Sequence, residues 1–412
     1  MTTRSASSQA IDPRSLRIAD YTYVLPDERI AQHPLADRDA SKLLVFRDGE
    51  ITDTHFRSLA DHIPEGSLLV LNDTRVVKAR VTFQRTSGAV IECMVLEPED
   101  ARPMEAALNA RGHSRWRCMV GNAKRWKGED LVRGEGLDEL RMHRVDDRDG
   151  EHLIEFSWDG DRTFSEILVI HGSVPLPPYM RRDAVEDDTT RYNTVFAERD
   201  GSVAAPTASL HFTIPMLDEL ARKNVRQARV TLHVGAGTFL PVKSETMIGH
   251  VMHSEQVRVP RPTVEALLAS IDQAPIIPVG TTALRTIESL YWFGADLCKD
   301  PYLPSLHTDQ WRPYTNDADV LPRLALEAVI AWMDSHKRTE VAGSTSLLIA
   351  PGYHFRLANA LITNFHQPGS TLLLLVAALI GDRWREVYDH ALANGYRFLS
   401  YGDGSLLWRR DQ

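Results

Sequence analysis

The sequence predicts an α/β protein that also contains a separate β-rich segment. The first observation is the alternation, from residue 165 onward, of apolar strand-like runs, glycine-rich turns and helix-like segments, which is typical of α/β folds. The second is the stretch from 76 to 160, where short β-like runs are separated by turn-rich segments, as in small antiparallel sheets and barrels. The third is the length of 412 residues, which corresponds to roughly two to three domains.

The composition excludes several classes of protein. Apolar residues at 43% and charged residues at 25% are ordinary for globular proteins, so disordered and fibrous classes are excluded. The longest apolar run, 372–380, is far shorter than the roughly 20 residues of a membrane helix, and we expect no membrane segment. The N-terminus lacks the apolar stretch of a secretory signal, and three dispersed cysteines predict reduced thiols, so we expect a cytoplasmic protein. Because the formal net charge is −9, any RNA partner needs a local basic patch.

The first clear strand covers 67–71 and runs directly into Asn72, Asp73, Thr74 and Arg75. One interpretation of this polar segment is a turn stabilised by Asx hydrogen bonds. The other is a ligand contact at the junction with the β-rich segment, because ligand sites tend to form between domains.

Three later strand–turn–helix units share a layout in which polar residues follow the strand. The units are strand 230–234 with the turn 235–238, strand 276–280 with Thr281 and Thr282 before a helix, and strand 360–366 with 367–371 before the helix 372–380. Open α/β sheets bind ligands at this edge, because helix N-termini present free N–H groups there. We therefore expect these edges to converge on one site. A further polar cluster, 400–403, follows a strand-like run at 396–399.

Several of these motifs also have a purely structural interpretation. The turn 235–238 lacks the third glycine and the lysine of nucleotide-binding loops, so it is either a ligand cradle or a tight turn. His250, His253 and Glu255 suggest a metal site, an acid–base group or packing, but no HExxH pattern accompanies them. Arg285 and Glu288 are spaced as a solvated helix pair.

Residues 111–127 contain six lysines or arginines and no acid, with Trp116 and Trp126 between them. Basic charge interleaved with aromatic rings suits RNA whose bases stack while its phosphates are neutralised. The alternative is a solvated strand face above two buried tryptophans.

Read in order, the polar motifs resemble one known family. The matching motifs are NDTRV (72–76), PLPPY (175–179), VAAPTA (203–208), LHF (210–212), TLHVGAGTF (231–239), His250 with MHSE (252–255), VGTT (279–282), TNFH (363–366) and YRF (396–398) with SYGD (400–403). Together they closely resemble the S-adenosylmethionine:tRNA ribosyltransferase-isomerases of queuosine synthesis, from about residue 20 to residue 403. Lys78, Ser209 and Gln367 stand where the family commonly has proline, glycine and leucine. Ser209 raises the question of whether that position needs a positive φ.

The resemblance implies a reaction and its partners. S-adenosylmethionine is the ribosyl donor, and the acceptor is 7-aminomethyl-7-deazaguanine at the wobble position of tRNAs with GUN anticodons, which are those for Asp, Asn, His and Tyr. The product is epoxyqueuosine in tRNA, with release of adenine and methionine. No metal is implied, and no cofactor beyond S-adenosylmethionine as co-substrate. We expect a monomer.

The resemblance also implies a discontinuous α/β catalytic domain, residues 20–75 and 161–412, interrupted by a small antiparallel β-barrel at 76–160. From the sequence itself we expect a flexible leader at 1–19. A proline-containing insertion at 292–339, with a helix at 320–333, is expected to be a lid or packing element.

Candidate site residues follow from the same motifs. The candidates for proton transfer are His233, His253, Glu255, His211 and Asp73, with His233 or His253 as the proton carrier and Glu255 tuning a neighbour. The candidates for substrate binding are Asn72, Arg75, Thr207, Gly235, Gly237, Thr238, Thr281, Thr282, Arg285, Asn364, His366, Ser370, Thr371, Tyr401 and Asp403. The candidates for RNA binding are Arg115, Arg117, Lys124, Arg125 and Lys127. The rival hypotheses are a metal-dependent hydrolase built on His250, His253 and Glu255, and a non-catalytic RNA-binding protein.

Overall fold

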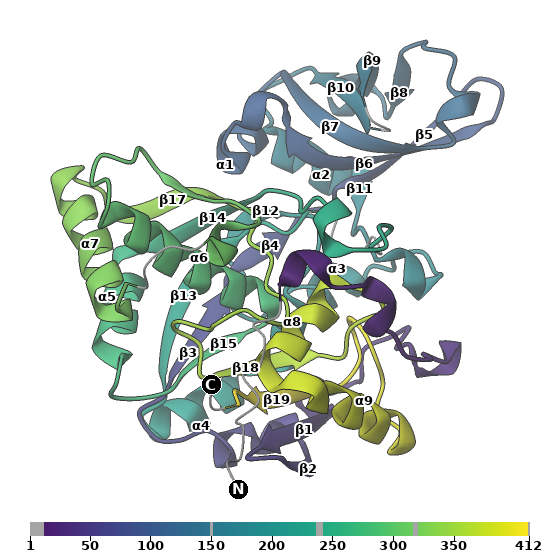
Figure 1. Ribbon diagram of the computed structural model, residues 1–412. Coiled ribbons are helices and arrows are strands. Elements are labelled where there is room, and N and C mark those ends of the chain that lie inside the picture. The colour runs from purple at the N-terminus through teal and green to yellow at the C-terminus, as the bar shows by residue number, and fades with distance from the viewer. Residues whose placement is uncertain (1–11, 149–150, 236–241, 316–319, 411–412) are drawn as a thin grey trace, which may run out of the picture.

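The computed structural model describes residues 12–148, 151–235, 242–315 and 320–410. It contains a large mixed sheet and a separate seven-stranded antiparallel sheet that lies above one end of it (Figure 1). The predicted fold class is confirmed, with the smaller sheet curled as a half-barrel. No described helix is long and apolar enough to cross a membrane.

The large sheet has ten strands, and its central strands are parallel. Their spatial order is β16 (Leu306–Thr308), β17 (Glu340–Thr345), β14 (Glu255–Pro260), β13 (Arg226–Leu232), β3 (Leu68–Asn72), β15 (Ile276–Val279), β18 (Ala360–Asn364), β19 (Gly404–Trp408), β1 (Lys42–Arg47) and β2 (Glu50–His55). Because β13, β3, β15 and β18 run parallel, their carboxyl ends lie at the same edge of the sheet.

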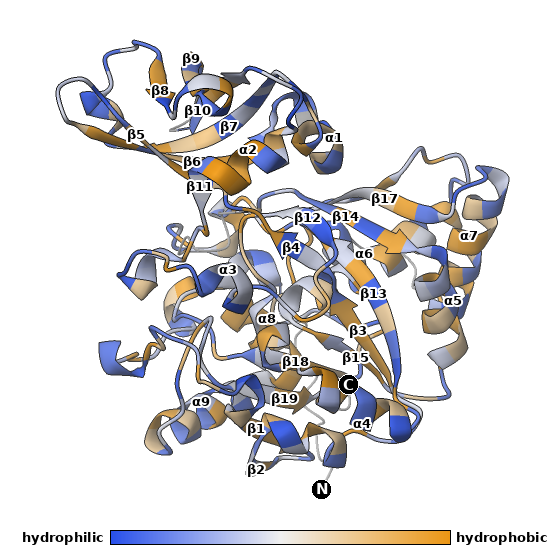
Figure 2. Ribbon diagram, turned by 180° about the vertical axis from the view of Figure 1, so that it is seen from behind, coloured by the Kyte–Doolittle hydropathy of each residue, from blue (hydrophilic) through white to orange (hydrophobic). Residues whose placement is uncertain are grey.

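Strand β3 shows why the central strands read as continuous apolar runs. Leu68 and Val70 pack with the core around helix α6 (Thr281–Leu297), whereas Leu69 and Leu71 pack with the core around helix α4 (Ile214–Arg222). Successive side chains of a strand point to opposite faces, so a strand covered on both faces is apolar at every position. Figure 2 shows the hydrophobic colour of β3 and β15. The remaining helices of this body are α3 (Asp188–Arg191), α5 (Arg261–Ser270), α7 (Pro322–Ser335), α8 (Thr371–Ile380) and α9 (Trp384–Ala393).

The inserted sheet is antiparallel throughout and has its own core. Its strand order is β11 (Gly172–Ser173), β5 (Arg80–Gln84), β6 (Val90–Pro98), β7 (His113–Gly121), β10 (Glu151–Trp158), β9 (Leu140–Arg148) and β8 (Leu131–Arg133). Helices α1 (Met104–Leu108) and α2 (Phe164–His171) contribute to the same core, so this body extends past the predicted boundary at residue 160. The sheet curls until the Arg133 side chain on β8 donates to the Thr82 carbonyl on β5.

The chain crosses between the two bodies at neighbouring points. Strand β4 (Thr74–Val76), on the way into the inserted sheet, pairs in parallel with β12 (Arg199–Ser202). The first and last strands of the insert, β5 and β11, pair with each other. The entry and the exit of the insert therefore lie side by side.

Some local predictions differ from the structure. The run 396–399 forms no strand; Phe398 makes a single bridge to Ile30, and the strand β19 begins only at Gly404. Ser209 lies in a 3-10 helix without a positive φ, so glycine is not required at that position. Of the predicted leader 1–19, residues 1–11 lie outside the described residues, while Leu16 and Ile18 hydrogen-bond with Met247 and Glu245.

The segment 292–339 is continuous with the rest of the α/β body. Its first residues complete helix α6, which runs to Leu297, and the predicted helix 320–333 is α7. Helix α7 packs its buried residues Leu326, Val329 and Met333 into the same core as α6. The expected role of this segment, as a lid or a packing element, stays a prediction.

Candidate functional site

A cavity of about 710 Å³ lies between the inserted sheet and the carboxyl edge of the large sheet. Its size falls within the roughly 300–1,000 Å³ of small-molecule sites. The predicted site residues that line it are His233, Gly235, His253, Glu255, Thr281, Thr282, Arg285, Ser370 and Thr371. Residues from segments far apart in the sequence are therefore brought to one place. Gly237 and Thr238 lie outside the described residues.

Asn72 ties three of the converging elements together. Its amide Nδ2 donates to the Leu232 carbonyl at 3.0 Å and to Thr282 Oγ1 at 3.2 Å, and its Oδ1 accepts from the Leu232 N–H at 3.0 Å. These bonds connect the ends of β3 and β13 with the start of α6. Asn72 is fully buried and does not line the cavity, so it positions the residues of the cavity without contacting a ligand itself.

His233 is held closely at the end of β13. Its Nδ1 lies 2.9 Å from the hydroxyl of Thr74, and no described residue bonds its Nε2. Gly201, with φ +146°, passes so near that a Cβ there would lie 2.8 Å from the imidazole. Burial, together with the charges of Arg258 and Arg199, lowers the pKa of His233 to about 4. The imidazole is therefore neutral at pH 7 and lines the cavity.

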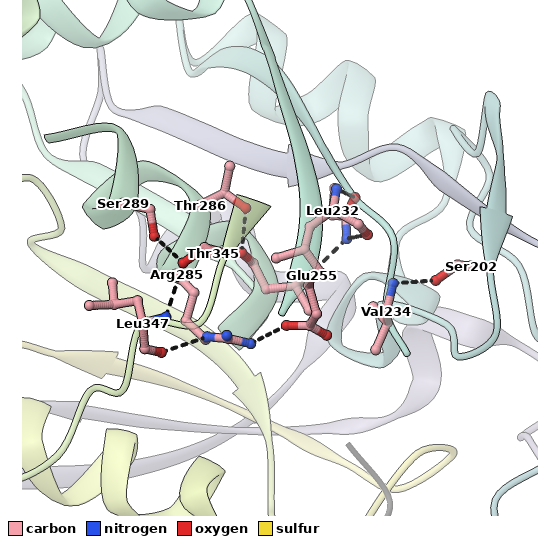
Figure 3. A network of polar contacts seen from close by, with 11 residues as sticks. Ser202, Leu232, Val234, Glu255, Arg285, Thr286, Ser289, Thr345 and Leu347 are labelled. Atoms are coloured by element: carbon pink, nitrogen blue, oxygen red, sulfur yellow. Dashed lines mark hydrogen bonds and ion pairs between the residues drawn. The ribbon is translucent and has the colours of Figure 1, made fainter. Parts of the chain in front are cut away.

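Glu255 and Arg285 form a buried ion pair beside the cavity (Figure 3). The Nη1 of Arg285 donates to Glu255 Oε2, and its Nε donates to the Leu347 carbonyl at 3.1 Å. Both side chains are less than 10% exposed. The predicted solvated pair of Arg285 and Glu288 is wrong, because Glu288 is buried and accepts from Tyr353 Oη and from backbone N–H groups at 356–358.

Two helix N-termini open onto the cavity. Gly280 precedes α6 with φ +88° and ψ 151°, a conformation essentially restricted to glycine, and no side chain caps this helix start in the described chain. Helix α8 begins after Ser370, whose hydroxyl accepts from the Leu373 N–H at 3.2 Å. Because free N–H groups and the helix dipole favour negative charge, these two starts suit a ligand carboxylate.

A smaller cavity of about 90 Å³ adjoins the first and shares Thr281, Thr282 and Ser370 with it. Thr207, Asn364 and His366 line this second cavity. The Oδ1 of Asn364 accepts from Thr207 Oγ1 at 2.9 Å, and its Nδ2 lies 3.3 Å from His211 Nε2. Burial lowers the pKa of both His211 and His366 to about 3. Both rings are therefore neutral, and His211 stacks on Phe56.

Six of the described residues predicted for catalysis or substrate binding line neither cavity: Asn72 and His211, described above, and Asp73, Arg75, Tyr401 and Asp403. Asp73 is buried, accepts from Thr231 Oγ1 at 2.6 Å, and has its pKa raised by burial. Arg75 is exposed and donates to the Ala197 carbonyl at 2.8 Å. Tyr401 Oη donates to Asp188 Oδ1 at 2.9 Å. Asp403 accepts from the N–H groups of Lys42 and Arg397, which are contacts that hold the chain before β19.

The basic segment lies on β7 and the turn that follows it. Trp116 and Trp126 are 1% and 3% exposed, so neither ring is available to stack on a base. Lys124, Arg125 and Lys127 are exposed at the turn. Of the basic residues on β7, Arg115 pairs with Glu155 at 2.6 Å, and Arg117 is exposed. The exposed basic side chains are therefore compatible with binding to RNA phosphates. The interpretation in which Trp116 and Trp126 stack on bases is wrong, because both rings are buried.

The metal interpretation receives no support from the geometry. Glu255 is engaged by Arg285, and His250 precedes β14 in a segment that is not helical. No group of three or more potential ligands among His, Cys, Asp and Glu occurs in the described residues.

The inserted sheet contributes a wall of the cavity that the sequence motifs do not predict. Glu97 and Pro98 on β6, Met119 on β7 and Glu151 on β10 line the large cavity. Gln256 on β14 accepts from the Met104 N–H at 3.1 Å and donates to the Arg102 carbonyl at 2.9 Å, which fixes the insert against the large sheet. The strand pattern contained no signal for these residues, because it does not show which face of one sheet meets another.

Comparisons with known proteins show which family the chain is similar to. The queuosine biosynthesis protein family matches residues 18–407. An S-adenosylmethionine:tRNA ribosyltransferase-isomerase of Anaeromyxobacter dehalogenans (strain 2CP-C) is 38% identical over 96% of this chain and 100% of its own length. One from Ruegeria sp. (strain TM1040) is 39% identical over 95% of this chain and 99% of its own. A solved structure of an S-adenosylmethionine tRNA ribosyltransferase from Thermotoga maritima is 28% identical, covering 94% of this chain and 99% of its own, with a TM-score of 0.45.

Proposed function

The chain belongs to the queuosine biosynthesis protein family, and on this premise we propose that it is a ribosyltransferase-isomerase acting on S-adenosylmethionine and tRNA. It transfers and isomerises the ribosyl moiety of S-adenosylmethionine onto 7-aminomethyl-7-deazaguanine at the wobble position. The products are epoxyqueuosine-tRNA, adenine and methionine. The acceptors are tRNAs with GUN anticodons, and the enzyme acts as a monomer in the cytoplasm, where these tRNAs are used.

The observation that supports this reaction best is the large cavity between the two sheets. One wall offers two helix N-termini for the carboxylate of the donor's methionine moiety, at Thr281–Thr282 and Ser370–Thr371. The opposite wall belongs to the inserted sheet, which carries the exposed basic turn. A nucleoside donor on one wall and an extruded base on the other would lie next to each other in this cavity. Enzymes that act on a base take it out of the stack into such a pocket.

His233 is our candidate for proton transfer, with His253 as its alternative. The sulfonium acidifies the ribose 5′ protons, so a positioned base is needed, and a positioned acid or base typically supplies about 10²–10⁴ in rate. His233 is neutral at pH 7 and its Nε2 has no partner among the described residues, so it can exchange a proton with a ligand in the cavity. Glu255 holds Arg285, and Arg285 in turn supports the wall beside the start of α6.

The decisive experiment combines the enzyme, S-adenosylmethionine and tRNA bearing the aminomethyl base. We expect release of free adenine and an increase in the mass of the anticodon nucleoside equal to the cyclopentene epoxide group. Neither change should occur with tRNA that lacks the modified base. Absence of adenine release under these conditions would reject the proposed reaction, and a reaction abolished by a chelator would favour the metal-dependent rival.

A further inference from the structure

Two carboxylates on the inserted sheet face the cavity without a protein partner. Glu97 on β6 and Glu151 on β10 both line it, and among the described residues neither forms a hydrogen bond or an ion pair. The orientation of Glu97 follows from a bulge in β6. Val95 pairs with Cys118 and Glu97 pairs with the adjacent Arg117, so Leu96 has no residue opposite it. Bulges of this kind re-aim side chains and are common beside active sites.

The charges around Glu97 come from several elements. Burial within the walls raises its pKa, and so do the negative charges of Glu151 on β10 and Glu255 on β14. His253, before β14, and Arg117 on β7 oppose this effect. Glu255 is already neutralised by Arg285, and Arg117 forms no ion pair with Glu97. Of the acidic residues that line this cavity, Glu97 and Glu151 are therefore the two whose carboxylates have no ion-pair or hydrogen-bond partner in the described chain.

Such acids are unfavourable at a site for tRNA unless a cation meets them. A polyanionic backbone is repelled by carboxylates, and both groups are open to a ligand, because Glu97 is exposed and Glu151 is half-buried. A second observation at the same cavity also indicates a ligand: His233 is 7% exposed, and its Nε2 has no partner in the described chain. The two carboxylates on the inserted sheet thus suit a ligand that carries a small cationic group on an otherwise anionic molecule.

We propose that Glu97 and Glu151 bind the protonated aminomethyl group of the acceptor base and thereby select acceptors that carry a primary amine. This inference rests on the proposed function. The donor's sulfonium is also cationic, but the donor is assigned to the helix N-termini on the opposite wall. An alkyl amine has a pKa near ~10 and arrives as an ammonium ion, which two carboxylates can hold by charge-assisted hydrogen bonds.

The test compares the affinities of two tRNAs that differ only at the wobble position. One carries 7-aminomethyl-7-deazaguanine and the other carries guanine, which lacks the cation. We expect the wild-type enzyme to prefer the first by about tenfold or more, and the double variant Glu97→Gln, Glu151→Gln to lose this preference. Glutamine keeps the shape of the side chain. Glu92→Gln is the matched control, because Glu92 is on the same strand, pairs with Arg80 and does not line the cavity.

Separate measurements distinguish the possible results. Affinity for S-adenosylmethionine, measured without tRNA, should be the same in wild type and both variants. If the double variant retains the preference for the aminomethyl base, or if it loses donor affinity instead, the inference is overturned. The single variant Glu97→Gln, which should lose part of the preference, serves if the double variant unfolds. Because the affinity ratio needs no turnover, failure of wild type to release adenine would reject the proposed reaction separately.

Discussion

At the scale of single residues, the site is built from histidines kept neutral by burial. His211 and His233 have pKa values of about 3 and 4, well below the ordinary value of about 6.5, because their surroundings disfavour the imidazolium ion. A neutral imidazole carries one donor and one acceptor, so each ring can bridge two polar groups. At His233 one of these positions is taken by Thr74 and the other remains available to a ligand.

This burial has a consequence for stability. Between about pH 6.5 and pH 3 the unfolded chain binds protons at His211 that the folded protein does not, so the free energy of unfolding falls as the pH is lowered. Each such histidine contributes up to about 1.4 kcal/mol per pH unit in its window. Urea unfolding at a series of pH values should show a shallower slope for His211→Gln than for wild type. Equal slopes would contradict a depressed pKa at this residue.

Thr74 should act as a positioning residue for His233. Thr74→Val keeps the shape of the side chain and removes the hydroxyl that lies 2.9 Å from Nδ1. We expect the single-turnover rate to fall by about tenfold, because one hydrogen bond to a ring that must hold its tautomer is lost. Thr74→Ser restores the hydroxyl and should restore most of the rate and the wild-type pH profile. If valine and serine behaved alike, the hydroxyl would have no such role.

At the scale of elements, the sequence predicts where strands end before helices. It does not predict which side chains those ends contact. The apolar runs at β3, β15 and β18 and the helices α6 and α8 follow from periodicity, because buried parallel strands and their helices leave strong patterns. The run 396–399 has the composition of a strand, because its buried aromatic residues pack against Phe365 at the end of β18 and Tyr388 on α9. The buried pair of Arg285 and Glu255 was missed, because local spacing suggests Glu288 as the partner.

The basic turn after β7 gives a prediction at this scale. Replacing Lys124, Arg125 and Lys127 by Glu should weaken tRNA binding. It should also reduce the slope of the logarithm of the binding constant against the logarithm of the salt concentration by up to about 2–3. S-adenosylmethionine binding should not change, because these residues do not line the cavity. Arg222→Glu on α4, also exposed, serves as the control. A triple variant with an unchanged salt slope would show that tRNA binds elsewhere.

At the scale of the whole molecule, the cavity exists only because two independently packed bodies face each other. The inserted sheet has its own core around Phe164, which packs with Trp116, Phe156 and Trp158. Sequence patterns predict each body, but the wall formed by Glu97 and Glu151 depends on how the two are placed. That placement rests on contacts between residues about 150 positions apart, such as Gln256 with Met104.

Gln256→Leu tests the importance of this placement. The substitution removes both hydrogen bonds between β14 and the segment 102–104. Since each bond contributes about 1 kcal/mol, we expect urea unfolding to show a loss of only about 1–2 kcal/mol. A loss of this size leaves the protein folded and does not by itself lower the rate. We nevertheless expect the single-turnover rate to fall, because the walls of the cavity are no longer fixed relative to each other. A rate equal to that of wild type would show that other contacts suffice.

The pairing of β5 with β11 places the two chain crossings next to each other, and this has a consequence for how the molecule can change. A segment whose ends are adjacent can be exchanged as a cassette without altering the strand order or register of its host. The inserted sheet, which we propose faces the tRNA, is thus free to diverge, or to be grafted from a relative, while the α/β body that we propose holds the donor keeps its architecture.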